Sequence, residues 1–70
     1  MTVNTFELKR IAGEVVGGVA SKVLMERIFV VLDEAPDPQT AVSKVEKIVA
    51  LFLGPNHAKT LERSFRQALG

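Results

Sequence analysis

The apolar positions in the first half of the chain follow the spacing of an α-helix. One stripe is formed by Leu8, Ile11, Ala12, Val15, Val19 and Val23, and beyond Gly17 and Gly18 the stripe moves to Leu24, Ile28, Val31 and Leu32. Asn4 is a favourable N-cap, and Glu7 follows three residues later as in a capping box. The pattern predicts a helix over about residues 5–33 whose buried face changes near the two glycines.

The paired glycines leave three structures open. Glycine has a poor helix propensity, so Gly17 and Gly18 can mark a kink. A continuous helix that packs on different neighbours at its two ends is the second possibility. The third is a β-hairpin with the glycines in its turn, which would leave the capping signal unused. We favour a helix with a kink.

Strong stop and start signals divide the second half of the chain. Pro36 excludes the helical conformation at the residue before it, and Asp37 followed by Pro38 is typical of a new helix N-terminus. Gly54 and Pro55 end that second helix. With Asn56 as the next cap, the predicted elements span about residues 5–33, 38–53 and 56–69, in one all-α domain of three helices over residues 1–70.

The length of the first helix predicts self-association. A straight helix over residues 5–33 would be roughly 42 Å long, whereas a compact body of this size has a radius of gyration of about 11 Å. A second copy of the chain would cover the excess, so we expect a homodimeric helical bundle. The residues expected at the interface are small or apolar: Gly13, Gly17, Ser21, Leu24, Ile28, Phe29, Val31, Leu32, Val49, Phe52 and Phe65. Gly13, Gly17 and Ser21 would form a ridge of small residues on one helix face, which favours close helix contact.

Composition narrows the class of protein. Of the 70 residues 47% are hydrophobic and none is cysteine, which leaves no disulfide and no thiolate ligand. A formal net charge of +1 gives no general attraction to nucleic acid or to an anionic membrane. Charged residues such as Glu14, Lys22 and Glu26 interrupt the first apolar segment, and the N-terminus lacks the pattern of a signal peptide. We expect a cytoplasmic protein without a membrane partner.

The polar residues form no recognisable catalytic or metal-binding pattern. Asp33, Glu34 and Asp37 surround a proline-rich turn, but their spacing fits no calcium loop. His57 is the only histidine, and no serine stands in a nucleophile motif beside it. The sequence therefore predicts no catalytic residue, no metal ligand and no cofactor, and we expect a protein that is not an enzyme.

The last predicted helix carries a basic edge formed by Lys59, Arg63 and Arg66. The preceding stretch, with Gly54 at a turn and Leu61 after it, resembles part of a helix-turn-helix motif, which implies possible DNA contacts from these three cations. Three features oppose the resemblance: Pro55 stands where an apolar residue is usual, Leu61 falls about one residue late, and Glu62 lies among the cations.

We therefore predict a small non-enzymatic interaction module, such as an adaptor, assembly factor or regulator. Its mechanism would be the insertion of apolar helix residues into a groove of another protein, with charges at the rim. The alternatives are a small dimeric DNA-binding regulator that uses the basic helix, and a structural subunit of a larger helical assembly.

Overall fold

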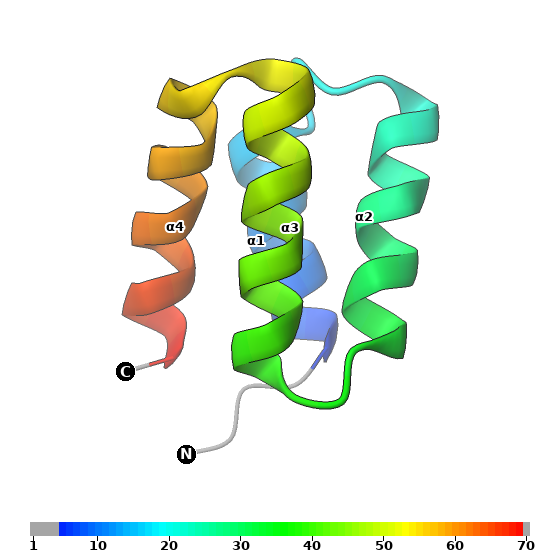
Figure 1. Cartoon of the computed structure of the whole chain (residues 1–70), viewed down its shortest axis with the longest axis vertical. Helices are drawn as coiled ribbons and strands as arrows, with labels where there is room; N and C mark the ends of the chain where they lie inside the picture. Colours follow the sequence, from blue (N-terminus) through cyan, green and yellow to red (C-terminus); the bar gives the residue numbers. More distant parts are fainter. Residues whose placement is uncertain (1–4, 70) are drawn as a thin grey trace.

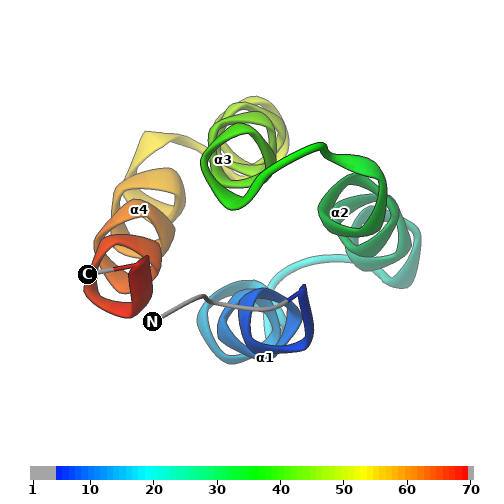
Figure 2. The ribbon, with the colours of Figure 1, turned by 90° about the horizontal axis from the view of Figure 1, so that it is seen from below.

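The chain folds into four α-helices, and the computed structural model describes residues 5–69. The helices are α1 (Thr5–Val16), α2 (Lys22–Glu34), α3 (Pro38–Leu53) and α4 (Pro55–Leu69), and the described residues form no strand. Consecutive helices run in opposite directions (Figure 1), and the four stand as a ring when seen along their axes (Figure 2). Each helix packs on two neighbours, α1 and α3 each lying between α2 and α4. The all-α prediction is confirmed, with four helices in place of three.

The predicted helix over residues 5–33 is two antiparallel helices joined by a reversal. The Gly17 amide still donates to the Gly13 carbonyl oxygen at 3.0 Å, and the Ala20 amide donates to the Val16 carbonyl oxygen at 2.8 Å. A Cβ atom on Gly17 would lie 2.3 Å from that Gly13 oxygen, so this backbone conformation accepts only glycine. The expected kink is therefore wrong, because the chain turns back on itself after α1.

Ser21 explains why α2 begins as a new helix. Its backbone is extended, with φ −68° and ψ 161°, and its side chain accepts a hydrogen bond of 3.1 Å from the Leu24 amide. This is the geometry of an N-cap, which satisfies one of the N–H groups that a helix start leaves without an intrahelical partner. The apolar stripe changes phase near the glycines because α2 starts with its own phase and faces α1.

The second half of the chain follows its sequence signals closely. Ala35, the residue before Pro36, is extended and ends α2. The Asp37 carboxylate accepts hydrogen bonds from the Thr40 amide at 2.8 Å and from the Thr40 hydroxyl at 3.0 Å. This cap, followed by Pro38 in the first turn, starts α3, whose bounds agree with the prediction.

The junction between α3 and α4 is a single residue, Gly54, in the left-handed region with φ 96°. The last helix begins at Pro55, so Asn56 lies in its first turn and is not its cap. The cap predicted at Asn4 lies outside the described residues.

All four helices contribute to one core. The fully buried side chains with the largest volumes are Phe65, Ile28, Leu61, Val16, Val45 and Val49. No polar or charged residue is buried among residues 5–69. The helices span a body with principal extents of 30 × 21 × 17 Å and a Cα radius of gyration of 10.6 Å. Because α1 and α2 lie side by side, the overhanging helix that the sequence predicted does not exist.

Candidate interaction surface

The residues predicted at an interface occupy three different environments. Five of them, Leu24, Ile28, Leu32, Val49 and Phe65, belong to the core of the single chain. Gly13, Phe29 and Val31 are half-buried, and Gly17, Ser21 and Phe52 are exposed. The buried residues already pack against the chain's own helices, and one of the five, Leu24, also lines a surface groove.

The predicted ridge of small residues does not form on one helix face. Gly13 lies in α1, Gly17 lies in the turn, and Ser21 caps α2. The ridge required a helix that continues through Ser21, and α1 ends at Val16. A Cβ atom added at Gly13 would meet nothing within 4 Å, so no neighbouring helix approaches this position closely.

A groove lies where the start of α2 meets the end of α3. It has a volume of about 450 Å³ and is lined by Val19, Ser21, Val23, Leu24, Arg27, Phe52 and Leu53. Its rim is unusually apolar for a surface, because Val23 is 74% exposed and Phe52 is 64% exposed. Leu51, on the last turn of α3, is 82% exposed. The groove therefore brings together three residues that the sequence predicted at an interface, Ser21, Leu24 and Phe52.

Sequence reasoning placed two residues of this groove on the wrong side. Val19 and Val23 continued the inward stripe of a single first helix, yet both are exposed. The signal that could have found them is the change of stripe after Gly18, since a new helix that buries Leu24 and Ile28 turns Val23 outward.

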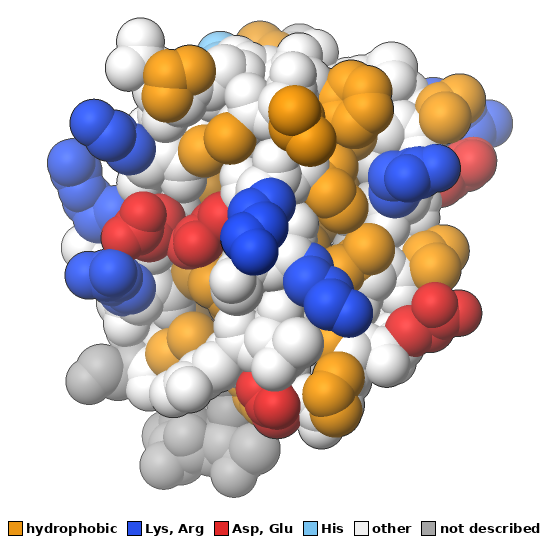
Figure 3. Space-filling view, in the orientation of Figure 1, with side chains coloured by type: hydrophobic (Ala, Val, Ile, Leu, Met, Phe, Trp, Pro, Cys, Tyr) orange, Lys and Arg blue, Asp and Glu red, His pale blue; other side chains and the backbone are white. Residues whose placement is uncertain are grey.

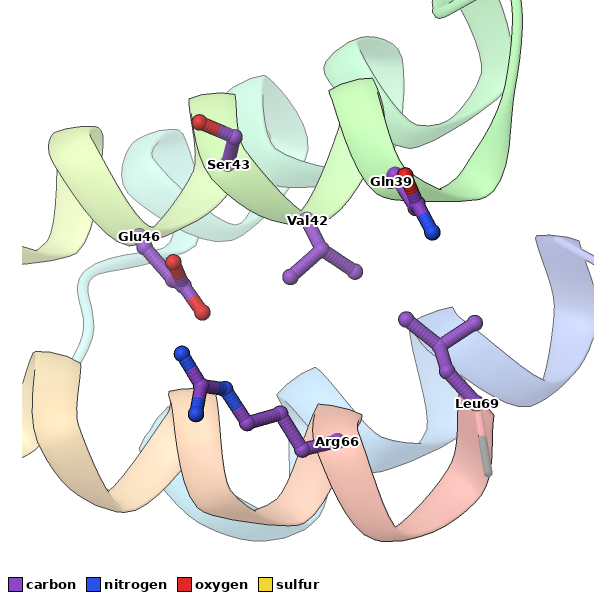
Figure 4. Close-up of a pocket in the computed structure, with 6 residues that line it drawn as sticks. All are labelled: Gln39, Val42, Ser43, Glu46, Arg66 and Leu69. Carbon is purple, nitrogen blue, oxygen red and sulfur yellow. The ribbon is translucent and has the colours of Figure 1, made fainter.

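A second hollow, of about 550 Å³, lies between α3 and α4 (Figure 4). Its walls carry the side chains of Val42 and Leu69 and, at one end, Glu46 and Arg66, which point toward each other. Partial burial and the nearby Glu62 carboxylate raise the pKa of Glu46, and Arg66 acts against that change. The hydroxyl of Ser43 points away from Glu46 (Figure 4). The arrangement places no nucleophile beside this carboxylate, so its chemistry is that of a partly desolvated acid at a helix seam.

The basic edge of α4 is exposed but mixed in charge. Lys59, Arg63 and Arg66 all lie at the surface. The Arg66 guanidinium is held by the Glu62 carboxylate at 2.8 Å, one turn earlier on the same helix. Side chains of both signs alternate in this region (Figure 3).

Two acidic residues near the turn after α2 make contacts that stabilise the fold. The Asp33 carboxylate pairs with the Lys9 ammonium at 2.9 Å, and Asp37 caps α3. Residues 5–69 contain no group of three His, Asp or Glu side chains placed to hold a metal ion. None of the helices in this part of the chain combines the length and apolar character that a membrane crossing requires.

No family model, no curated protein and no solved structure matches this chain.

Proposed function

We propose that this protein is a small non-enzymatic interaction module that binds a helix of another protein through apolar contacts. The observation that carries the proposal is the apolar groove between α2 and α3, with Val23 and Phe52 exposed on its rim. Helix-in-groove binding needs a hollow with apolar walls that accepts side chains spaced one turn apart. In this arrangement the chain supplies the groove, whereas the sequence predicted that its own apolar helix residues would enter a groove of the partner.

The exposed side chains of the groove are not required by the core. Each helix buries its own apolar stripe inside the ring, and these stripes pack together without the exposed groove residues Val19, Val23 and Phe52. Large exposed apolar side chains that cluster at one place mark interaction sites more often than isolated ones do. The cluster at the α2–α3 groove therefore supports binding.

Self-association remains a proposal of its own. An overlong first helix does not require it, because α1 and α2 are separate helices that pack against each other. Light scattering over a concentration series, on the wild type and on Phe52→Ser, tests a homodimer directly. A dimer that the substitution dissociates would place a second copy on the groove, and a mass that keeps growing with concentration would favour the structural subunit.

DNA binding is the alternative from a different class. It would use Lys59, Arg63 and Arg66 on α4, and its affinity would fall steeply with added salt. The side-by-side, antiparallel packing of α3 and α4 (Figures 1 and 2) differs from a helix-turn-helix, in which the two helices cross at a large angle. The structure therefore adds no observation in favour of this alternative.

Site-specific photo-crosslinking separates these functions. A photoreactive residue would replace Phe52 in one variant and Phe6 in a matched control, since Phe6 is 74% exposed and belongs to α1. Exposed to extract of the source cells, the variant at position 52 should capture one discrete protein at low and at high salt, and the control should not. Equal capture by both variants, or capture of nucleic acid that disappears with salt, would contradict the proposal.

A further inference from the structure

Two rows of side chains border the seam between α2 and α3. Val23, Arg27 and Val31 follow one another at intervals of four residues on α2, and Lys44, Ile48 and Phe52 do the same on α3. Residues at this spacing share a helix face. Val31 and Ile48 pack partly against the core, whereas Val23 and Phe52 are exposed on the groove. We call these two rows the α2–α3 seam; apolar side chains gather along it with basic ones beside them (Figure 3).

The cations at this seam form no ion pair with another described residue. Arg27 and Lys44 lie in the two rows, and Lys47 lies one turn after Lys44, all exposed. Within residues 5–69, none of the three forms an ion pair. The cations of α1 contrast with them, because Lys9 pairs with Asp33 at 2.9 Å and Arg10 pairs with Glu14 at 2.7 Å. The seam thus combines apolar side chains with cations that no ion pair within residues 5–69 neutralises.

Charge complementarity identifies the chemistry of the occupant. We infer that the α2–α3 seam binds an amphipathic helix of a partner protein that carries Asp or Glu residues beside its apolar stripe. The apolar side chains would enter the groove at Val23 and Phe52, and the carboxylates would meet Arg27, Lys44 and Lys47. This inference rests on the proposed function and specifies the partner's sequence character.

The shape of the seam favours a helix over the other apolar or acidic occupants. An aromatic side chain presents about 150–250 Å² when fully exposed and a valine presents less, so the partly exposed groove residues Val19, Val23 and Phe52 together present on the order of 300 Å². A stable dimer between two globular copies needs about 800 Å² from each. A bilayer surface is flat and would leave a groove of about 450 Å³ unfilled, and nucleic acid brings phosphates but few apolar groups.

Two synthetic peptides test the inference on the whole chain. Both carry leucines at i, i+4 and i+7 of a helical sequence; one has glutamates beside the leucines, and the other has lysines at the same positions. Fluorescence anisotropy should show tighter binding of the glutamate peptide. Phe52→Ser should weaken this binding by more than about tenfold, as for a central anchor of an interface, while the control Phe6→Ser leaves it unchanged.

A charge reversal tests the electrostatic half of the inference. Arg27→Glu should weaken binding of the glutamate peptide by roughly threefold to tenfold, because one exposed ion pair becomes a repulsion. The same substitution should strengthen binding of the lysine peptide. Circular dichroism of each variant confirms that the bundle remains folded.

The failures are distinguishable. If both peptides bind with equal affinity and Phe52→Ser abolishes the binding, the acidic character of the partner would be overturned. The proposed interaction function would be supported in that case. Binding of neither peptide would overturn both proposals, since the groove would then accept no apolar helix. Phe52-dependent binding to phosphatidylserine vesicles, or a dimer that Phe52→Ser dissociates, would overturn the inference by assigning the seam to a membrane or to a second copy.

Discussion

Replacement of Gly17 by alanine should strongly destabilise the bundle. A Cβ atom at this position would lie 2.3 Å from the Gly13 carbonyl oxygen, and the obstacle is backbone, which cannot rotate away as a side chain can. Relief requires the turn after α1 to change its backbone angles and to loosen the Gly17–Gly13 hydrogen bond of 3.0 Å.

The expected loss is the sum of two effects. Holding a residue in an unfavourable backbone conformation costs about 1–3 kcal/mol, and a hydrogen bond contributes about 1 kcal/mol net. A loss of about 2–4 kcal/mol would remove much of the roughly 4–10 kcal/mol that stabilises a domain of this size. In a domain this small the corresponding decrease in Tm is roughly 10–30 °C.

Thermal and urea denaturation followed by circular dichroism measure this loss, and the neighbouring glycines provide matched controls. A Cβ atom at Gly18 or at Gly13 would meet nothing within 4 Å, and neither residue has a positive φ. Alanine there should be neutral or stabilise by up to about 1 kcal/mol, because it lowers the entropy of the unfolded chain. If Gly17→Ala were as stable as Gly18→Ala, the close approach of Gly17 to the Gly13 carbonyl oxygen would be refuted.

Three further substitutions test other parts of the fold. Ser21→Ala removes the cap of α2 and should cost about 1 kcal/mol in urea denaturation, whereas Ser21→Asp, which keeps a capping oxygen, should cost little. Phe65→Ala empties the centre of the core and should cost about 3–5 kcal/mol, a large part of the total stability, while the exposed Phe52→Ala should change stability by less than about 0.5 kcal/mol. Glu46→Gln should raise Tm at neutral pH and leave it unchanged below the ordinary carboxyl pKa. The raised pKa of Glu46 means that the folded state binds the Glu46 proton more tightly than the unfolded chain does. The wild type therefore loses stability as the pH rises from the ordinary carboxyl pKa through the raised pKa of Glu46, whereas the Glu46→Gln variant has no such loss. An equal Tm for the wild type and the Glu46→Gln variant at neutral pH would contradict this effect.

Sequence signals located the second half of the fold because local chemistry determines it. Asp37 and Pro38 start α3 through a side-chain cap and a fixed φ angle, and Gly54 ends it through a positive φ. These effects operate within one turn of helix, so no knowledge of the distant chain is needed to find them.

The first half required information that the local sequence lacks. Gly17 and Gly18 are compatible with a kink as well as a reversal, and Ser21 fits a helix face as well as an N-cap. The choice depends on burial: only the reversal lays the stripe of α1 against that of α2, so that Leu8 and Ile28 enter one core.

The same choice decides which apolar residues remain at the surface. Because α2 begins as a separate helix at Lys22, Ile28 faces the core and Val23 faces solvent. A single continuous helix would place Val23 on the buried stripe of α1. Phe52 is the one large apolar side chain expected at an interface that the fold leaves exposed. The interaction role of these residues stays a prediction that the peptide and crosslinking experiments test.

The order of the helices around the ring has a kinetic consequence. Three of the four main contacts, α1–α2, α2–α3 and α3–α4, join helices that are consecutive in the sequence, and only α1–α4 closes a long stretch of chain. Contacts between sequence neighbours require little loop-closure entropy, and bundles dominated by them fold in microseconds to milliseconds. The helical hairpins can therefore form early and independently, and the seam between α1 and α4 closes last. Docking of α1 on α4 should then be the late step of folding, after the α2–α3 seam has assembled.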